Sequence, residues 1–431
     1  MWQAILIIIA FLVIAALMIA RKIPTLLALP LLAVLIAVIA GVPPISTDAD
    51  GNAAGFLNLV IEQGAVRMAS AYCAVIFGAW LGQLLNRTGV TETLIKKSAE
   101  LGGDRPLVAV LLLSVVTALL FTVLSGLGSV IMVGSIVLPI FISIGIPGAV
   151  AGSIFLLAFS TGLCFNIANW QVFQSIFGLD TSVIRNFEIV MAVVTAVATL
   201  IFILLQFRRN GVRAGFSVPA APTKPTLSGW RAPLAMITPL IPIVLVAVLD
   251  VPIISAFIVA ILWILVFTQV SFKKAMNTLT KTCYDGITDA APAVILMVGI
   301  GMLYMSVTHA SVQTVLTPLI AVITPKNAIV FAIFFSVLAP LALYRGPLNL
   351  FGLGSGLAAL MAGTGLLPVQ AVMGGFLSAE RVQSVGDPTN TQNVWVANYV
   401  NVDVNTITRM LLPYLWGIAI IGTIFTSVVY F

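Results

Sequence analysis

The stretch 160–169, STGLCFNIAN, interrupts an apolar segment with one glycine and two asparagines in the spacing G-x-x-x-N-x-x-N. The stretch 384–393, SVGDPTNTQN, repeats that spacing 224 positions later. The repeated residues are Gly162, Asn166 and Asn169 in the first half and Gly386, Asn390 and Asn393 in the second. Glycine and asparagine are weak helix formers, so both stretches predict a helix broken within an apolar span. An internal repeat that is broken at matching points is typical of secondary transporters, whose substrate site lies where the broken helices meet.

The composition indicates an integral membrane protein. Hydrophobic residues make up 61% of the 431 residues and charged residues 8%, and the mean hydropathy is +1.17. Soluble domains carry about 25% charged residues. The net charge of +6 collects in short loops between apolar runs, which indicates membrane orientation and argues against a nucleic-acid partner. We therefore expect a multi-pass protein of the inner (cell) membrane, surrounded by membrane lipids.

The sequence offers little for catalysis. Three scattered cysteines and one histidine, His309, predict neither a metal site nor a disulfide framework. No G-x-x-x-x-G-K-[ST] motif for nucleotide binding occurs, and a single histidine gives little support to a Ser-His-Asp arrangement. We expect the protein not to be an enzyme and to hold no cofactor.

The chain divides around a polar, basic segment that contains prolines. We predict a first repeat at 1–207, a cytoplasmic linker at 208–232 and a second repeat at 233–431. Apolar runs in the first repeat predict spans at 1–20, 24–41, 69–86, 106–124, 129–144, 148–177 and 182–207. Those in the second predict spans at 233–249, 252–270, 286–308, 328–344, 351–366, 368–398 and 404–431. The expected fold class is an all-α membrane protein with about ten transmembrane helices and two hairpins.

Basic residues orient these spans. With the linker in the cytoplasm, 14 of the 20 Lys and Arg residues fall on the cytoplasmic side, as the positive-inside rule requires. Each half then crosses the membrane an odd number of times. The two repeats are therefore expected to be inverted in topology, with both termini outside.

Two pairs of apolar segments are joined by turns of small and polar residues. SGLGS at 125–129 joins the first pair, and RGPLN at 345–349 joins the second. Backbone groups exposed to lipid are costly, so such turns are tolerated at membrane depth only beside protein or a polar cavity. We predict two re-entrant hairpins; the alternative is two full spans in each pair, joined by a solvent-exposed turn.

This layout resembles the ion transporter superfamily, and within it the gluconate permease and citrate/dicarboxylate transporter branch. The resemblance covers nearly the whole chain and rests on the turns SGLGS and RGPLNLFGLGSG and on STGLCFNIAN and SVGDPTNTQN. It implies elevator-type alternating access and an organic anion as substrate. A clear Ser-Asn-Thr signature of the sodium/dicarboxylate branch is absent, so a proton and a sodium ion are both candidate coupling ions.

Arg345 is the main candidate for binding the anion. An arginine at membrane depth costs at least roughly 2.5–3.5 kcal/mol by insertion scales, which argues for a function. Its guanidinium group presents a planar fork that matches a carboxylate. Asn349 lies in the same turn and is expected to assist. The alternative is an interfacial arginine that reaches the lipid headgroups.

The broken helices and the first turn supply the other candidates for substrate binding. They are Asn166, Asn169, Asn390, Asn393, Ser125 and Ser129. Amides both donate and accept hydrogen bonds, and therefore suit the hydroxyls and carboxylates of a small solute. The alternative is that these groups satisfy the backbone of the broken helices.

Asp387 is the main candidate for the coupling ion. It lies in G-D-P-T-N, where Pro388 lacks a backbone N–H and local unwinding is expected. A carboxylate at such a place can bind sodium or carry a proton. Thr389, Ser160 and Thr161 complete the predicted coupling site. The alternatives for Asp387 are a helix cap and a partner for Arg381.

The remaining intramembrane charges suggest structural roles. Glu380 and Arg381 are adjacent and predict an ion pair, whereas Glu188 and Asp289 are expected at the membrane interface. The stretch 87–105 predicts an amphipathic surface helix.

These observations favour a secondary active transporter of a small organic anion, a carboxylate or sugar acid, that functions as a homodimer and uses a proton or sodium gradient. One alternative is a sodium/proton antiporter that depends on Asp387. Another is the membrane subunit of an assembly that receives its substrate from a binding protein.

Overall fold

The structure is a computed structural model that describes residues 2–20, 22–48, 50–210, 227, 229–269 and 271–431. Most of the expected linker, at 211–226 and 228, lies outside the described residues. The described chain is α-helical, and its β-structure is limited to an isolated bridge between Thr47 and Ala53. The all-α fold class predicted from the sequence is confirmed.

The described part of the first half contains eleven helical elements. They are α1 (Trp2–Ile19), α2 (Thr25–Ile39), η1 (Phe56–Gln63), α3 (Gly64–Val66), α4 (Ala69–Arg87), α5 (Val90–Gly102), α6 (Pro106–Phe121), α7 (Gly126–Ser143), α8 (Gly148–Leu163), α9 (Ile167–Phe177) and α10 (Thr181–Asn210).

The second half contains twelve over the residues that the structure describes. They are α11 (Arg231–Met236), α12 (Leu240–Leu249), α13 (Ile253–Thr268), α14 (Phe272–Val307), α15 (Ala310–Ile323), α16 (Ala328–Leu338), η2 (Ala339–Arg345), α17 (Gly354–Gly363), α18 (Val369–Ser378), η3 (Val382–Gly386), α19 (Thr391–Tyr399) and α20 (Val404–Val429).

Several helices are long and apolar enough to cross a membrane. Among the described residues six helical segments meet this test, and α8 and α9, bent by 61° at their break, pass it only when taken together, as a broken span or a re-entrant loop. The six segments are Phe56–Arg87, Gly126–Ser143, Thr181–Arg209, Phe272–Val307, Ala328–Arg345 and Val404–Val429. Seven shorter apolar helices of 10–17 residues complete the apolar part of the described chain. The molecule is therefore a multi-pass membrane protein.

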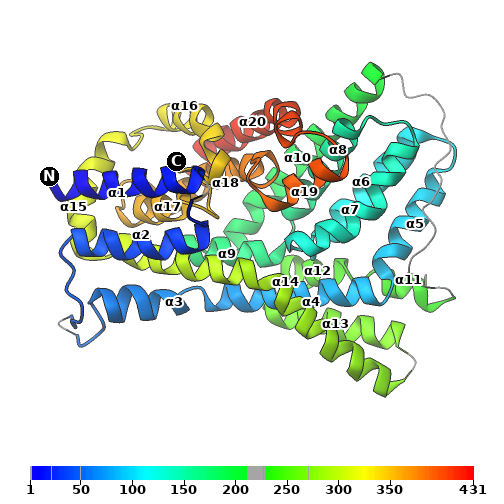
Figure 1. The fold of residues 1–431 in the computed structure, drawn as a ribbon, viewed down its shortest axis with the longest axis horizontal. Helices are drawn as coiled ribbons and strands as arrows, with labels where there is room; N and C mark the ends of the chain where they lie inside the picture. The colour runs from blue at the N-terminus through cyan, green and yellow to red at the C-terminus, as the bar shows by residue number, and fades with distance from the viewer. Residues whose placement is uncertain (1, 21, 49, 211–226, 228, 270) are drawn as a thin grey trace.

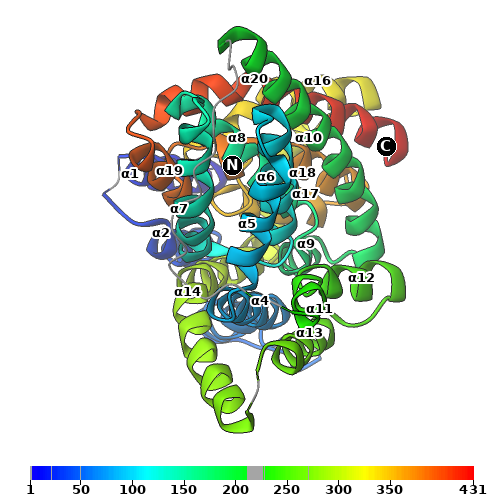
Figure 2. The same cartoon turned by 90° about the vertical axis from the view of Figure 1, so that its right-hand side faces the viewer.

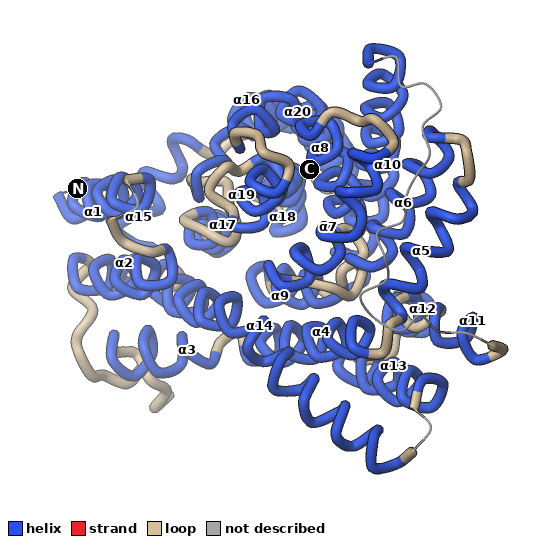
Figure 3. The backbone as a smooth tube through the Cα atoms, turned by 45° about the vertical axis from the view of Figure 1, so that its right-hand side comes forward, coloured by secondary structure: helices blue, strands red, loops and turns tan. Residues whose placement is uncertain are grey.

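The longest helix organises the molecule. α14 runs across it and packs along both α2 and α4, as Figure 1 shows. Seen end-on in Figure 2, α4, α13 and α14 lie on one side, and α10, α16 and α20 lie on the other. The tube in Figure 3 places α9, α17, α18 and α19 between these two groups. The elements that carry the predicted breaks therefore lie in the interior of the molecule.

Both predicted breaks are present. In the first half α8 ends at Leu163 and α9 begins at Ile167. In the second half the π-helical turn η3 ends at Gly386, and α19 begins at Thr391 after an extended Asp387 with φ −70° and ψ 114°. The two G-x-x-x-N-x-x-N stretches thus interrupt their helices at matching places.

The two hairpins differ in length. In the second hairpin α17 has 10 residues, which at 1.5 Å per residue span about 15 Å, half the hydrocarbon core. This arm is too short to be a full span, which supports the re-entrant interpretation. In the first hairpin α6 has 16 residues and α7 has 18, so its length is compatible with either alternative.

Three elements differ from the sequence expectation. α14 begins at Phe272 rather than 286, because its lysine-bearing first turns continue the helix instead of forming a loop. α15 was not predicted; His309 caps it by accepting a hydrogen bond from the Ser311 backbone at 3.2 Å. The predicted span 69–86 is extended backwards to Phe56 by η1 and α3.

Candidate functional site

A cavity of about 210 Å³ lies where the two hairpin turns meet the two broken helices. Its polar lining consists of Ser125, Asn169, Asp289, Arg345, Asn349, Glu380, Gln383, Ser384, Asn390 and Gln392. Its apolar lining includes Phe159, Leu163 and Phe351. Five residues predicted to bind substrate are therefore brought together: Ser125, Asn169, Arg345, Asn349 and Asn390. Segments far apart in the sequence form one polar pocket inside an apolar protein.

Arg345 ends η2 at the second turn, with a left-handed backbone at φ 57°. The side chain is half-buried, and one Nη1–H donates to the carbonyl of Phe351 at 3.2 Å. The four remaining N–H groups of the guanidinium have no protein acceptor among the described residues. Arg345 also lines a second cavity of about 600 Å³, between α19 and the residues Met18, Ile23, Pro24 and Thr25. It thus lines two cavities and has donors available to a ligand.

Two helices begin at the cavity without a side-chain cap. Ser125 precedes α7 and Asn390 precedes α19, and neither side chain accepts a hydrogen bond from the first turn of its helix. The first N–H groups of a helix have no partner within the helix and carry partial positive charge. Both residues line the cavity, so these two N-termini add positive potential to that of Arg345.

Asn166 has a different role from Asn169. The Asn166 side chain donates to the carbonyls of Phe121 and Leu124, both at 3.1 Å, and accepts from the first backbone N–H groups of α9. It therefore joins the end of α6 to the first break and satisfies backbone groups. The side chain of Asn169 lines the cavity and makes no hydrogen bond within the described residues. Of the two asparagines in this motif, Asn166 is therefore structural and Asn169 faces the cavity.

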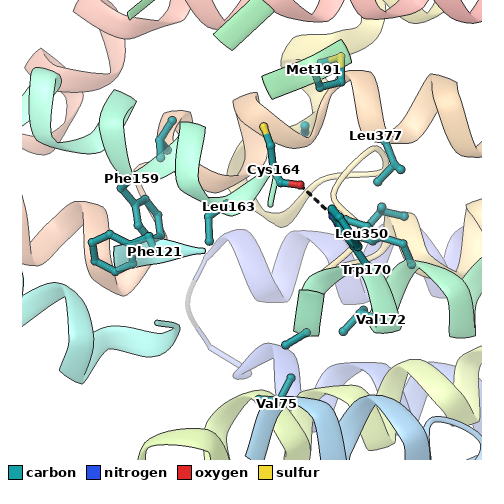
Figure 4. Close-up of a cluster of buried hydrophobic side chains, with 14 of the residues drawn as sticks. Val75, Phe121, Phe159, Leu163, Cys164, Trp170, Val172, Met191, Leu350 and Leu377 are labelled. Atoms are coloured by element: carbon teal, nitrogen blue, oxygen red, sulfur yellow. Dashed lines mark hydrogen bonds between the residues drawn. The ribbon is translucent and has the colours of Figure 1, made fainter. Parts of the chain in front are cut away.

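The first break is held by apolar packing as well. The indole N–H of Trp170 donates to the carbonyl of Cys164 at 2.8 Å, and the ring is buried (Figure 4). Phe121 and Phe159 meet edge to face with ring centroids 4.6 Å apart, next to Leu163. Edge-to-face aromatic pairs are worth about 0.5–1.5 kcal/mol beyond their buried area. The break is therefore a packed, defined structure.

The asparagines of the second break satisfy backbone carbonyls in the same way. Asn390 donates to Gln383 and Ser384 at 2.6 and 3.0 Å, and Asn393 donates to Asp387 and Ser384 at 2.8 and 3.3 Å. Asn390 also lines the cavity, whereas Asn393 is buried outside its lining. Asn393 Oδ1 is buried and accepts no hydrogen bond within the described chain.

Asp387 is fully buried and does not line the cavity. Its Oδ2 accepts from the backbone N–H of Arg345 at 3.0 Å and from the Asn349 amide at 3.4 Å. Its Oδ1 accepts from the backbone and hydroxyl of Thr389 at 2.8 and 2.7 Å. Both oxygens are thus engaged with protein donors, and the carboxylate joins the second turn to the second break.

The other predicted coupling residues lie outside the cavity lining. The Thr161 hydroxyl bonds to Leu157 and contacts Thr199 on α10 at 3.4 Å. Ser160 is fully buried, and its hydroxyl has no hydrogen-bond partner in the described part of the chain. Ser129, which was predicted to bind substrate, is also outside the lining and is buried in α7 near Gly82. Five of the predicted site residues therefore line the cavity, and the others lie outside its lining.

Asp289 was missed as a site residue. It was expected at the membrane interface, but the early start of α14 places it inside that helix, where it lines the cavity. Its carboxylate accepts a hydrogen bond from Gln83 and lies against Gly128 in the first turn of α7. Gly286, Asp289 and Ala293 are spaced so that they share one face of a helix. This spacing is the sequence feature that places Asp289 within a helix.

Glu188 was also misplaced. It was expected at the interface but is 0% exposed, because α10 turns it towards Arg381. Arg381 forms ion pairs with Glu188, at 3.8 Å, and with the adjacent Glu380, which lines the cavity. The predicted pair of Glu380 and Arg381 is confirmed, with Glu188 as an unforeseen third member. In the described residues no group of three or more His, Cys, Asp or Glu side chains is arranged to hold a metal ion.

Comparison with known proteins identifies the fold. No protein-family model and no curated protein sequence matches this chain. Among solved structures it is similar to the YdaH transporter of Alcanivorax borkumensis, with a TM-score of 0.62 and 13% sequence identity. The match covers 94% of this chain and 97% of the other. The two proteins therefore share a fold over nearly their whole lengths.

Proposed function

We propose that this protein is a secondary active transporter of a small organic anion, a carboxylate or a sugar acid, driven by a proton or sodium gradient. The observation that carries the proposal is the convergence of Arg345 and the uncapped N-termini of α7 and α19 on one interior cavity. Arg345 and the two N-termini present positive potential that favours an anion, and the Asp289 carboxylate in the same lining accepts a hydrogen bond from Gln83. The fold shared with a transporter supports transport as the activity.

The size and polarity of the cavity support a small, hydroxylated or carboxylated substrate. Its volume of about 210 Å³ is below the roughly 300–1,000 Å³ typical of pockets for drug-sized ligands. The lining offers amides from Asn169, Asn349, Asn390 and Gln392, which pair with hydroxyls as well as carboxylates. In this proposal Arg345 binds the carboxylate, and the amides bind the rest of the solute.

The arrangement of helices suits elevator-type movement, which we propose takes place within a homodimer. The hairpins and broken helices supply most of the polar lining of the cavity, whereas α14, which packs along α2 and α4, lines one side of it with Asp289, Ala290 and Met297. In our proposal the first group moves the bound anion across the membrane, and the second group stays fixed. The matching breaks support two inverted repeats and, with the sequence resemblance, a relation to the gluconate permease and citrate/dicarboxylate branch.

The two alternatives are less well supported. A sodium/proton antiporter would depend on Asp387, whose oxygens already accept hydrogen bonds from the protein and lie outside the cavity lining. A membrane subunit would require a binding protein. Uptake of a carboxylate by the purified chain alone excludes the subunit, and uptake without sodium/proton exchange excludes the antiporter.

The proposal is tested with purified protein in liposomes. A panel of carboxylates and sugar acids is screened for thermal stabilisation of the protein, which mass action requires of any bound ligand. Uptake of the best ligand is then measured for wild type, Arg345→Gln and Arg185→Gln. Arg185 pairs with exposed Asp250 at 2.9 Å, so its variant controls for loss of a positive charge.

Arg345→Gln retains the backbone N–H that Asp387 accepts and removes only the guanidinium. Charged hydrogen bonds are worth about 1.5–3 kcal/mol, so binding is expected to weaken roughly ten- to hundredfold. Arg185→Gln is expected to behave like wild type. Unchanged uptake by Arg345→Gln would remove the role assigned to Arg345, and absence of binding by every anion would overturn the proposed function.

A further inference from the structure

A cluster of three charged side chains lies between the cavity and α10. Glu188, Glu380 and Arg381 are 0–1% exposed, and Arg381 pairs with both carboxylates. We call these three residues the charge triad. Buried charges are costly unless they are paired and hydrogen-bonded. A buried triad of this kind inside a membrane protein is therefore a candidate for a function.

The charge triad connects the two halves of the protein. Arg381 Nη1 donates to the Ser160 carbonyl at 2.7 Å and lies 2.9 Å from Cys164 Sγ, at the first break. Glu188 comes from α10, in the first half, whereas Glu380 and Arg381 lie between α18 and η3, in the second. A change in the ion pairs of Arg381 would therefore alter its contacts at both broken helices.

The charges of the triad do not balance. Two carboxylates and one guanidinium give a net charge of −1 when all three are ionised. Neither oxygen of Glu188 accepts a hydrogen bond of ordinary geometry within the described residues, and the neutral donor beside it is the Cys164 thiol. One proton, shared between the two carboxyl groups, makes the triad neutral.

Other titratable groups around the triad are few. The Cys164 thiol lies against Arg381 and beside Glu188, and the Tyr430 ring packs at a tilt against Phe187, the residue before Glu188. On the cavity side Glu380 shares the lining with Asp289 and Arg345. Arg409, the single basic residue of α20, lines a separate cavity with Arg209. In the described part of the chain, therefore, only Arg381 offers a positive charge that pairs with Glu188.

Glu380 links the triad to the substrate. It lines the cavity that also holds Arg345, so an anion bound there lies close to the Glu380 carboxyl group. Two negative charges in a site of low dielectric repel each other strongly. Binding of the anion and binding of a proton to the triad are therefore mutually favourable, and this coupling is reciprocal.

We propose that the charge triad is the proton-binding site that couples anion transport to a proton gradient. This inference rests on the proposed function and names its coupling ion. When Arg381 pairs with Glu380, the proton resides on Glu188. When Arg381 pairs with Glu188, the proton resides on Glu380 and exchanges with water in the cavity. Arg381 thus exchanges partners as one proton moves between the two carboxyl groups, and no other co-reactant is needed.

The experiment measures anion binding by calorimetry over a series of pH values at constant sodium. The probe is the tightest-binding member of a panel of lactate, gluconate, succinate and citrate. Buffers of different ionisation enthalpy give the number of protons taken up, after correction for the probe's own titration. The variants are Glu188→Gln, Glu380→Gln and the control Asp250→Asn, which removes an exposed carboxylate that pairs with Arg185 on the same helix as Glu188.

For wild type and Asp250→Asn we expect uptake of about one proton per anion, and affinity that rises up to about tenfold for each unit fall in pH. Glu188→Gln and Glu380→Gln each leave one carboxylate for Arg381, a neutral pair that mimics the protonated triad. Both variants are expected to bind the anion with less than twofold change across the same range. Their uptake into liposomes should no longer respond to a pH gradient.

The outcomes separate the two proposals. Absence of anion binding at every pH contradicts the proposed function itself. Anion binding by wild type without proton uptake leaves the proposed function standing and overturns the triad as coupling site. Proton uptake that persists in both glutamine variants also overturns it, because the proton then binds elsewhere. Thermal unfolding shows whether each variant is folded; both are expected to match wild type because Arg381 keeps one carboxylate partner, as it does in the protonated triad.

Discussion

Asp387 and Arg345 are joined through the backbone: Asp387 Oδ2 accepts the N–H of Arg345 at 3.0 Å. At this turn Tyr344 and Arg345 both have left-handed backbones, with φ of 56° and 57°. Non-glycine residues adopt this conformation at an energetic cost, and it persists only where the surroundings enforce it. Asp387 supplies that constraint from the second break, so the position of the Arg345 side chain depends on the integrity of the broken helix.

The first prediction is that Asp387→Ala destabilises the protein. The variant loses the hydrogen bonds to Arg345 and to Thr389 and leaves buried donors without an acceptor. Hydrogen bonds to charged groups are worth about 1.5–3 kcal/mol each, so we expect a loss of at least roughly 3 kcal/mol. Thermal unfolding of the purified protein measures the loss. Asp387→Asn, which keeps an acceptor, should lose less; wild-type stability of the alanine variant would contradict this structural role.

The second prediction contrasts two asparagines of one motif. Asn166→Ala removes the cap of α9 and two hydrogen bonds to α6 and the first turn, and should cost about 2 kcal/mol or more of stability. Asn169→Ala should leave stability within about 0.5 kcal/mol, since its amide has no partner among the described residues, and should weaken anion binding several-fold. Thermal unfolding and calorimetry are measured on both variants. Equal losses of stability would show that the two amides share one role.

The sequence is informative about these breaks because their determinants are local. Gly162 and Asn166 lie at the break between α8 and α9, and Gly386 and Asn390 lie at the break between η3 and α19. Both pairs stand out in the sequence because the residues around them are mostly apolar. The apolar runs likewise determine the all-α membrane fold. Arg345 stands out for the same reason, as a charge flanked by apolar residues.

The partners of the charges are not visible in the sequence. Glu188 and Arg381 lie in different halves, and only the packing of α10 against the break at Cys164 brings them together. Asp289 was misjudged because Lys273 and Lys274 resemble a loop, although they begin a helix of 36 residues. Tertiary contact therefore decides which polar residues are structural and which line the cavity.

The third prediction concerns the close approach of α6 and α8. A Cβ at Gly162 would overlap the carbonyl of Ala118 and lie 2.9 Å from Cβ of Phe121. Gly162→Ala must push α6 away from the first break, and such overpacking typically costs about 1–3 kcal/mol. Gly417→Ala in α20 is the control, because a Cβ there would meet no atom within 4 Å and alanine favours a helix. Thermal unfolding should show a loss for Gly162→Ala alone, and an equal response of both variants would contradict the close packing.

The fourth prediction is a gain rather than a loss: removal of one negative charge from the cavity should tighten anion binding. Asp289 lines the cavity and lies against the first turn of α7, where its carboxylate opposes an incoming anion. At an effective dielectric constant near 20, two charges about 8 Å apart repel by roughly 2 kcal/mol, and part of this is screened. Asp289→Asn keeps an acceptor for Gln83 and should tighten anion binding by about three- to tenfold, measured by calorimetry. If Asp289 instead holds a sodium ion, the same variant binds the anion more weakly and loses its response to sodium, so the direction of the change decides which charge the cavity accommodates beside Arg345.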